Sequence, residues 1–84
     1  MNSHFVKRIA QRMKKQISVA IKNELTVAIE NRFHDRDVSE ILTPLDYLKR
    51  NEIEECLKCE TWELFANCIK RKFNDAKIRA ARLK

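Results

Sequence analysis

Residues 61–83, TWELFANCIKRKFNDAKIRAARL, carry the clearest helical pattern in this chain. Their apolar side chains recur at steps of three and four residues, which places them on one face of an α-helix. These residues are Trp62, Phe65, Ile69, Phe73, Ala76, Ala80 and Leu83. Thr61 comes just before this stripe and has a side chain suited to capping a helix N-terminus. The segment therefore predicts a C-terminal helix that packs along one face.

A second helix is predicted before it, from Pro44 to about Cys59. Thr43 and Pro44 form a start signal, because proline has the backbone geometry of the first helical turn and lacks the donor that is unsatisfied there. Residues 34–37 are polar and predict a connection. Asp37, with the glutamate three residues later, fits a capping box for a short helical turn.

Residues 5–33 predict a long N-terminal helix. One apolar stripe runs through this segment at helical spacing, from Val6 to Ile29. A helix of about 28 residues would be roughly 42 Å long, more than the diameter of so small a globule. Part of the stripe therefore needs a partner, which favours a dimer. The predicted fold is all-α: one domain over residues 1–84, with a long first helix packed against a pair of helices.

Composition narrows the class of protein. The chain has 84 residues, no glycine and one proline, so Gly-rich phosphate loops and hairpin-rich barrels are improbable. So short a chain has little volume for a catalytic cleft, which favours a non-enzymatic protein without a cofactor. It has no apolar run long enough for a membrane span and no secretory signal pattern. We expect a cytoplasmic protein of a bacterium or of a virus-infected host. The acid-free opening allows a mitochondrial presequence as the alternative.

Charge is distributed unevenly along the chain. Residues 1–23 and 65–84 each carry +6, and residues 24–64 carry −6. The cationic ends either pair with the acidic middle or face an external polyanion, and the second interpretation predicts a nucleic acid or nucleoprotein partner. The expected phosphate contacts are Lys70, Arg71, Lys72, Lys77, Arg79 and Arg82, assisted by Arg8, Arg12 and Lys15.

The alternative is a protein-only adaptor or inhibitor, such as a small phage-encoded protein that blocks a host complex. Its contact surface would be the acidic middle of the chain. The residues expected there are Glu52, Glu54, Glu55, Glu60 and Glu63.

Three cysteines are the remaining candidates for chemistry. Zinc would need four ligands, and Cys56, Cys59 and Cys68 could reach that number only with His34. We expect instead three reduced cysteines that act as small buried apolar residues, with no metal. The odd number also favours a reducing compartment.

Residues 52–73, EIEECLKCETWELFANCIKRKF, resemble the helix-turn-helix of sigma-factor-type DNA readers. The chain departs from that pattern at Glu54, where a small residue is usual, and at Lys58, where the turn favours glycine. The second helix shows no evident run of Arg, Asn or Gln for reading bases, so weak sequence preference is expected. A second likeness, to the Hha-type nucleoid modulators, implies binding to DNA-coating proteins. It rests on Thr43, Asp46-Tyr47-Leu48, Arg50, Cys56 and Thr61-Trp62-Glu63, needs a two-residue insertion and has no counterpart for the first 40 residues.

Overall fold

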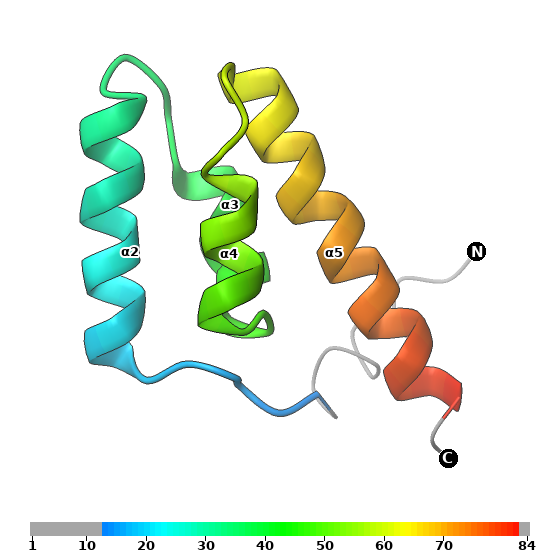
Figure 1. Ribbon diagram of the computed structural model, residues 1–84. Helices are drawn as coiled ribbons and strands as arrows, with labels where there is room; N and C mark the ends of the chain where they lie inside the picture. Colours follow the sequence, from blue (N-terminus) through cyan, green and yellow to red (C-terminus); the bar gives the residue numbers. More distant parts are fainter. Residues whose placement is uncertain (1–12, 83–84) are drawn as a thin grey trace.

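The computed structural model describes residues 13–82, which form four α-helices and no strand (Figure 1). The helices are α2 (Val19–Arg32), α3 (Ser39–Asp46), α4 (Arg50–Cys56) and α5 (Trp62–Arg82). The all-α class is confirmed. The three-helix arrangement is wrong, because the segment predicted as one second helix belongs to two helices, α3 and α4.

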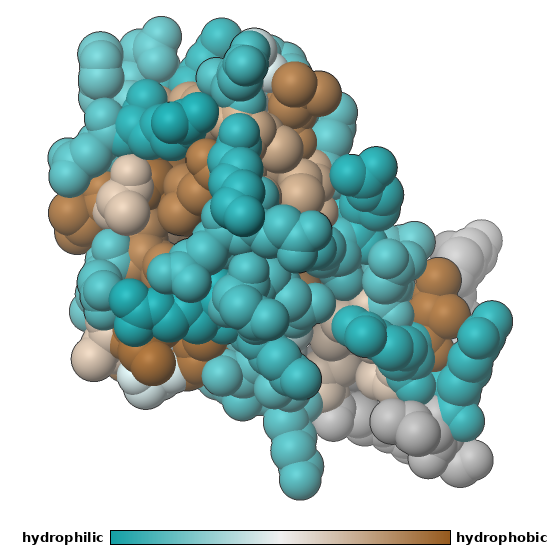
Figure 2. Space-filling view, viewed as in Figure 1, coloured by the Kyte–Doolittle hydropathy of each residue, from teal (hydrophilic) through white to brown (hydrophobic). Residues whose placement is uncertain are grey.

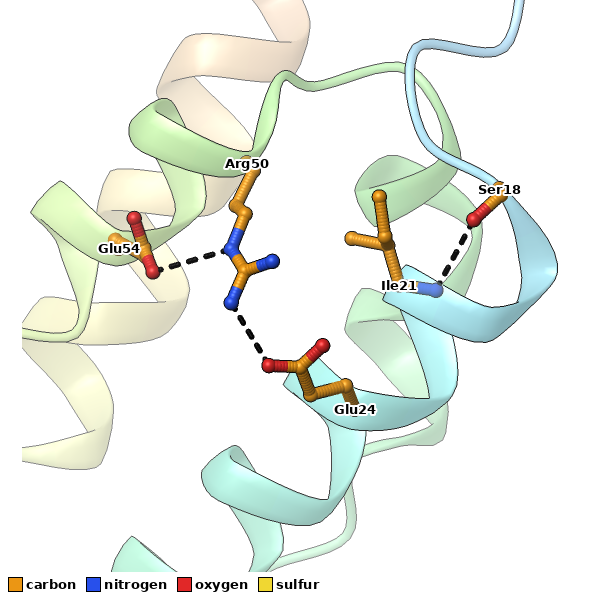
Figure 3. A network of polar contacts seen from close by, with 5 residues as sticks. All are labelled: Ser18, Ile21, Glu24, Arg50 and Glu54. Carbon is orange, nitrogen blue, oxygen red and sulfur yellow. Dashed lines mark hydrogen bonds and ion pairs between the residues drawn. The ribbon is translucent and has the colours of Figure 1, made fainter.

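The first described helix is much shorter than predicted. Ser18 caps α2, and its Oγ accepts the backbone N–H of Ile21 at 3.2 Å (Figure 3). Residues 13–18 are not helical; there Ile17 is buried in the core, and the backbone N–H of Gln16 donates to the carbonyl of Asp46 at 2.8 Å. The predicted long helix is therefore wrong over residues 13–18, because tertiary contacts hold this segment out of the helix. Residues 5–12 lie outside the described range.

Helix α3 begins earlier than predicted. The Asp37 carboxylate accepts the backbone N–H of Ser39 at 3.0 Å, and a helix does start near Asp37. The predicted capping box is wrong, because the cap residue of α3 is Val38 and no side-chain cap hydrogen bond forms there. Pro44 was predicted to begin a helix but lies inside α3. The chain then turns before α4, where Lys49 donates its backbone N–H to the Glu52 carboxylate at 2.9 Å. This contact satisfies a donor that helix N-termini leave unpaired.

Helix α5 begins where the sequence predicts and supplies much of the core. The hydroxyl oxygen of Thr61 accepts the backbone N–H of Leu64 at 3.2 Å. Phe65 and Ile69 are completely buried, and Phe65 stacks on Phe33 with ring centroids 5.3 Å apart. The predicted apolar stripe therefore faces α3 and α4.

The helices form a narrow assembly in which α2 and α5 lie at opposite edges with α3 and α4 between them (Figure 1). Arg50 of α4 joins two helices, because its guanidinium contacts Glu24 of α2 at 2.7 Å and Glu54 of its own helix at 3.3 Å (Figure 3). The hydrogen bond to Glu54, together with the nearby Glu24 charge, raises the pKa of Arg50.

A disulfide between Cys56 and Cys68 corrects the expectation of three reduced cysteines. It joins the last residue of α4 to α5, with a Cα–Cα separation of 5.6 Å, inside the usual range for such bonds. Both residues are buried, so the expectation of packing is confirmed for them. The third thiol, Cys59, is half-buried and unbonded.

Candidate nucleic-acid interface

Most of the predicted phosphate-binding residues lie on α5. Lys70, Arg71, Arg79 and Arg82 are exposed, and Lys72 and Lys77 are half-buried. Lys15 is exposed in the segment before α2. Arg8 and Arg12 lie outside the described residues. The structure thus brings six of the candidate cations onto one helix.

Some of the opposite charges in the chain pair with one another. Lys22 Nζ lies 3.0 Å from Asp46 Oδ1, which joins α2 to the end of α3. Lys72 Nζ lies 3.4 Å from Glu55 Oε2, which joins α5 to α4. The interpretation in which the cationic ends pair with the acidic middle is therefore confirmed for these pairs.

Two further pairs on α5 are long. Lys70 lies 3.9 Å from Glu40, and Arg79 lies 4.0 Å from Glu52. The Lys70 and Arg79 side chains are 52% and 66% exposed. Exposed pairs of this kind contribute little to stability, so a phosphate group could replace the carboxylate at small cost.

Other cations form no ion pair with any residue in the range 13–82. Among them are Lys14 and Lys15 before α2, and Arg71, Lys77 and Arg82 on α5. Lys77 lies over the Phe73 ring, 4.8 Å from its centroid. Tyr47 stacks on the same ring, with ring centroids 5.8 Å apart.

The segment that holds Lys14 and Lys15 is attached to the end of α3. The backbone N–H of Gln16 donates to the carbonyl of Asp46. Tyr47, the residue after Asp46, stacks on Phe73 near the middle of α5.

The acidic candidates are distributed differently from what a shared contact surface requires. Glu52, Glu54, Glu55 and Glu63 contact Arg79, Arg50, Lys72 and Arg36, respectively. Glu60 is exposed and forms no ion pair within residues 13–82. The structure does not bring these five carboxylates together as one free acidic surface.

An open cavity of about 440 Å³ lies between the start of α5 and the end of α2. Phe33 and Trp62 line its apolar side, with ring centroids 5.6 Å apart. Arg36 and Glu63 also line it and pair at 3.4 Å. Charges of both signs thus lie side by side in the lining of this cavity.

Two residues that sequence reasoning did not single out share the exposed side of α5. Asn67 and Asn74 are exposed, and Arg71 lies between them at helical spacing. The signal was present in the sequence as the set of residues opposite the apolar stripe. The expectation of weak sequence preference stays a prediction.

Figure 2 shows mostly hydrophilic residues over the centre of the face that α4 and α5 share. Exposed large apolar side chains lie on both outer helices: Val19 and Val27 of α2 are 74% and 54% exposed, and Leu64 and Ile78 of α5 are 56% and 43% exposed. Within residues 13–82, no helix is long and apolar enough to cross a membrane, and no group of three acidic, histidine or cysteine side chains is arranged to hold a metal ion.

Comparisons with family models, with curated proteins and with solved structures found no match to this chain. The residues and their geometry are therefore the whole basis for the proposals that follow.

Proposed function

We propose that this protein is a non-enzymatic regulatory or accessory protein that binds nucleic acid, alone or within a nucleoprotein complex. The observation that carries the proposal is which charges stay unpaired within the described residues. Four of the five candidate glutamates contact cations of the same chain. Three of the six α5 candidates are paired as well, but Arg71, Lys77 and Arg82 have no carboxylate partner in the described range. Cations therefore outnumber the unpaired acidic residue, Asp75, on α5, as binding to phosphates requires.

The protein-only alternative, acting through the acidic middle, has fewer unpaired groups. A partner that used Glu52, Glu55 and Glu63 would replace their pairs with Arg79, Lys72 and Arg36, just as a phosphate on Lys70 or Arg79 would replace a carboxylate. Only Glu60 of that set offers a carboxylate without such competition in residues 13–82.

The salt dependence of binding tests the proposal. Each phosphate neutralised releases a counterion, so about five contacts on duplex DNA give a log–log slope near −4 to −5. Replacing Lys70, Arg79 and Arg82 by alanine should reduce the slope by about 3. Lys58→Ala is the matched control, because Lys58 is exposed but lies in the connection between α4 and α5. No retention of any nucleic acid at about 50 mM salt would overturn the proposal.

We also propose that the protein self-associates through α2. The long helix that suggested a dimer is wrong over residues 13–18, so this proposal rests on exposed side chains of α2 instead. Val19 and Val27 are among the most exposed large apolar side chains of the described residues. At about 100° per residue, Val27 lies opposite Leu25 and Ile29, which are buried, and Val19 lies on the flank of the helix. Exposed apolar side chains on a helix favour a second packing partner.

The compartment is part of the proposal as well. We propose that the protein acts in the cytoplasm, where the Cys56–Cys68 pair would be reduced. Trapping the thiols with an alkylating reagent during cell lysis tests this, with three modified cysteines as the expected result. Recovery of the intact disulfide would place the protein in an oxidising compartment.

A further inference from the structure

The strongest unused feature of the molecule is the outer side of α5. Its exposed residues recur at steps of three and four, so they form one line along the helix. From the N-terminal end they are Leu64, Asn67, Arg71, Asn74, Ile78 and Arg82. The line lies opposite the stripe that packs on α3 and α4, and α5 is itself at the edge of the molecule (Figure 1).

We propose that this line reads base edges in the major groove of duplex DNA, with Arg71 at its centre. The inference rests on the proposed function and deepens it, because it names duplex DNA as the nucleic acid and base contacts as the source of specificity. An α-helix fits the major groove of B-form DNA. Helix α5 packs on the rest of the fold with one side only and lies at the edge of the molecule, so its other side can enter that groove without displacing any described part of the fold.

The residue types on the line match the chemistry of the groove. Arg forms two hydrogen bonds with guanine, Asn forms two with adenine, and apolar side chains contact the thymine methyl group. Arg71 is free of ion pairs with described residues, and Asn67 and Asn74 make no side-chain hydrogen bond within that range. Their donors and acceptors are therefore available to a ligand.

Cations flank the line on both sides, which is the arrangement that a groove-bound helix needs. At about 100° per residue, Lys70 and Lys77 lie on one side of the line, and Arg79 lies on the other. The phosphates of the two strands border the groove, so both flanks would meet a backbone. Lys70 and Arg79 also form the two longest ion pairs of the described residues.

One acidic side chain adjoins the line. Asp75 is exposed and lies one helical turn after Arg71. A carboxylate facing a phosphate would oppose binding, but a carboxylate facing a base edge can accept a hydrogen bond from cytosine N4. The proposal therefore requires Asp75 to face a base edge and not a phosphate.

The length of the line sets the size of the site. From Asn67 to Asn74 the helix rises about 10 Å, at about 1.5 Å per residue. Base pairs are about 3.4 Å apart, so one copy of α5 would read about three base pairs. Duplex RNA would be excluded as a specific ligand, because its major groove is too deep and narrow for side chains.

The test is a selection from a library of random DNA duplexes with the intact chain, followed by binding measurements on the enriched sequence. We expect an enriched core of about three base pairs. Asn67→Ala, Asn74→Ala and Arg71→Lys should each reduce the preference for that core roughly 5- to 150-fold, without changing affinity for random duplexes to a similar extent. Arg71→Lys is informative because lysine keeps the charge but loses the two-pronged contact.

Matched controls separate this inference from the proposed function. Lys70→Ala and Arg79→Ala should each lower the salt slope by about 1 and leave the preference intact. Circular dichroism should show unchanged helix content for every variant, since all these positions are exposed. That check excludes misfolding as the cause of lost preference.

The other outcomes overturn the inference in distinguishable ways. Salt-dependent binding without an enriched core, or with equal preference in the Asn variants, would refute base reading and leave the proposed function standing. Absence of any binding would refute both. A lower molecular mass of the Asn67→Ala or Arg71→Lys variant in light scattering would assign this side of α5 to a second copy of the chain instead.

Discussion

Asp37 lies just before α3 and contacts its first residue. Its carboxylate accepts the backbone N–H of Ser39 at 3.0 Å, and Pro44 lies inside the helix. This backbone hydrogen bond, with a further one to the Ser39 side chain, lowers the pKa of Asp37 below its ordinary value of 3.8. Pro44 alone would have placed the start five residues later.

Replacing Asp37 by alanine should make the stability difference from wild type depend on pH. A carboxyl with a lowered folded-state pKa stabilises the fold above its unfolded pKa, and this contribution is lost as the pH falls through the folded pKa. Wild type should therefore be more stable than Asp37→Ala at neutral pH, and the difference should vanish in acid. Urea unfolding at a series of pH values measures it. Asp35→Ala is the control, and a difference that does not change with pH would contradict the assignment.

At the scale of elements, contacts between helices override two local patterns. The apolar periodicity continues through residues 13–18, yet Ile17 enters the core from a non-helical segment and Ser18 caps α2. The segment from Pro44 to Cys59 divides into α3 and α4 at a turn. In both places tertiary packing outweighs a regular pattern. Apolar periodicity shows which side of a helix is apolar, but it does not show whether the helix is unbroken.

The Cys56–Cys68 bond makes a prediction about α4 and α5. Replacing both residues by alanine should lower the free energy of unfolding by about 2–4 kcal/mol, because the cross-link restricts the unfolded chain. A reducing agent should destabilise the wild type but leave this double variant unaffected. Thermal unfolding with and without reductant measures both effects, and Cys59→Ala should respond to reductant as the wild type does. A wild-type protein that is oxidised in vitro and is still insensitive to reductant would contradict the bond. A reduced sample would not, because the pair is proposed to be reduced in the cytoplasm.

At the scale of the whole molecule, only some of the charged side chains pair with an opposite charge of the same chain. Pairs such as Lys22–Asp46 and Lys72–Glu55 join the cationic ends to the acidic middle. The second half of α5 keeps cations beyond this pairing and contains no buried residue after Ile69. The proposals therefore rest on the cations of α5 and on the exposed valines of α2.

Self-association should depend on α2. Light scattering at micromolar concentrations should report a mass above that of the 10.0 kDa monomer, and replacing Val19 and Val27 by serine should return it to the monomer. The reason is that these side chains cover no part of their own core. Ile78→Ser, on the exposed side of α5, is the matched control. A wild-type monomer at these concentrations would remove self-association from the proposal.

Some features of this protein follow from local sequence. The all-α class, the polar connection after α2, the Thr61 cap and the buried face of α5 depend on residues within a few positions of one another, so periodicity and capping rules predict them. The cationic character of α5 follows from composition in the same way.

Only the tertiary structure decided the rest. The Cys56–Cys68 bond spans 12 positions and the Arg50–Glu24 contact spans 26, and no local rule predicts which distant groups meet. The start of α2 after Ser18 depends on Ile17, which reaches a core built mainly by later helices. The line of Asn67, Arg71 and Asn74 became a surface only because the opposite side of α5 packs on α3 and α4. Local propensity selects the elements, whereas the free energy of packing them together selects their ends, their cross-links and their exposed sides.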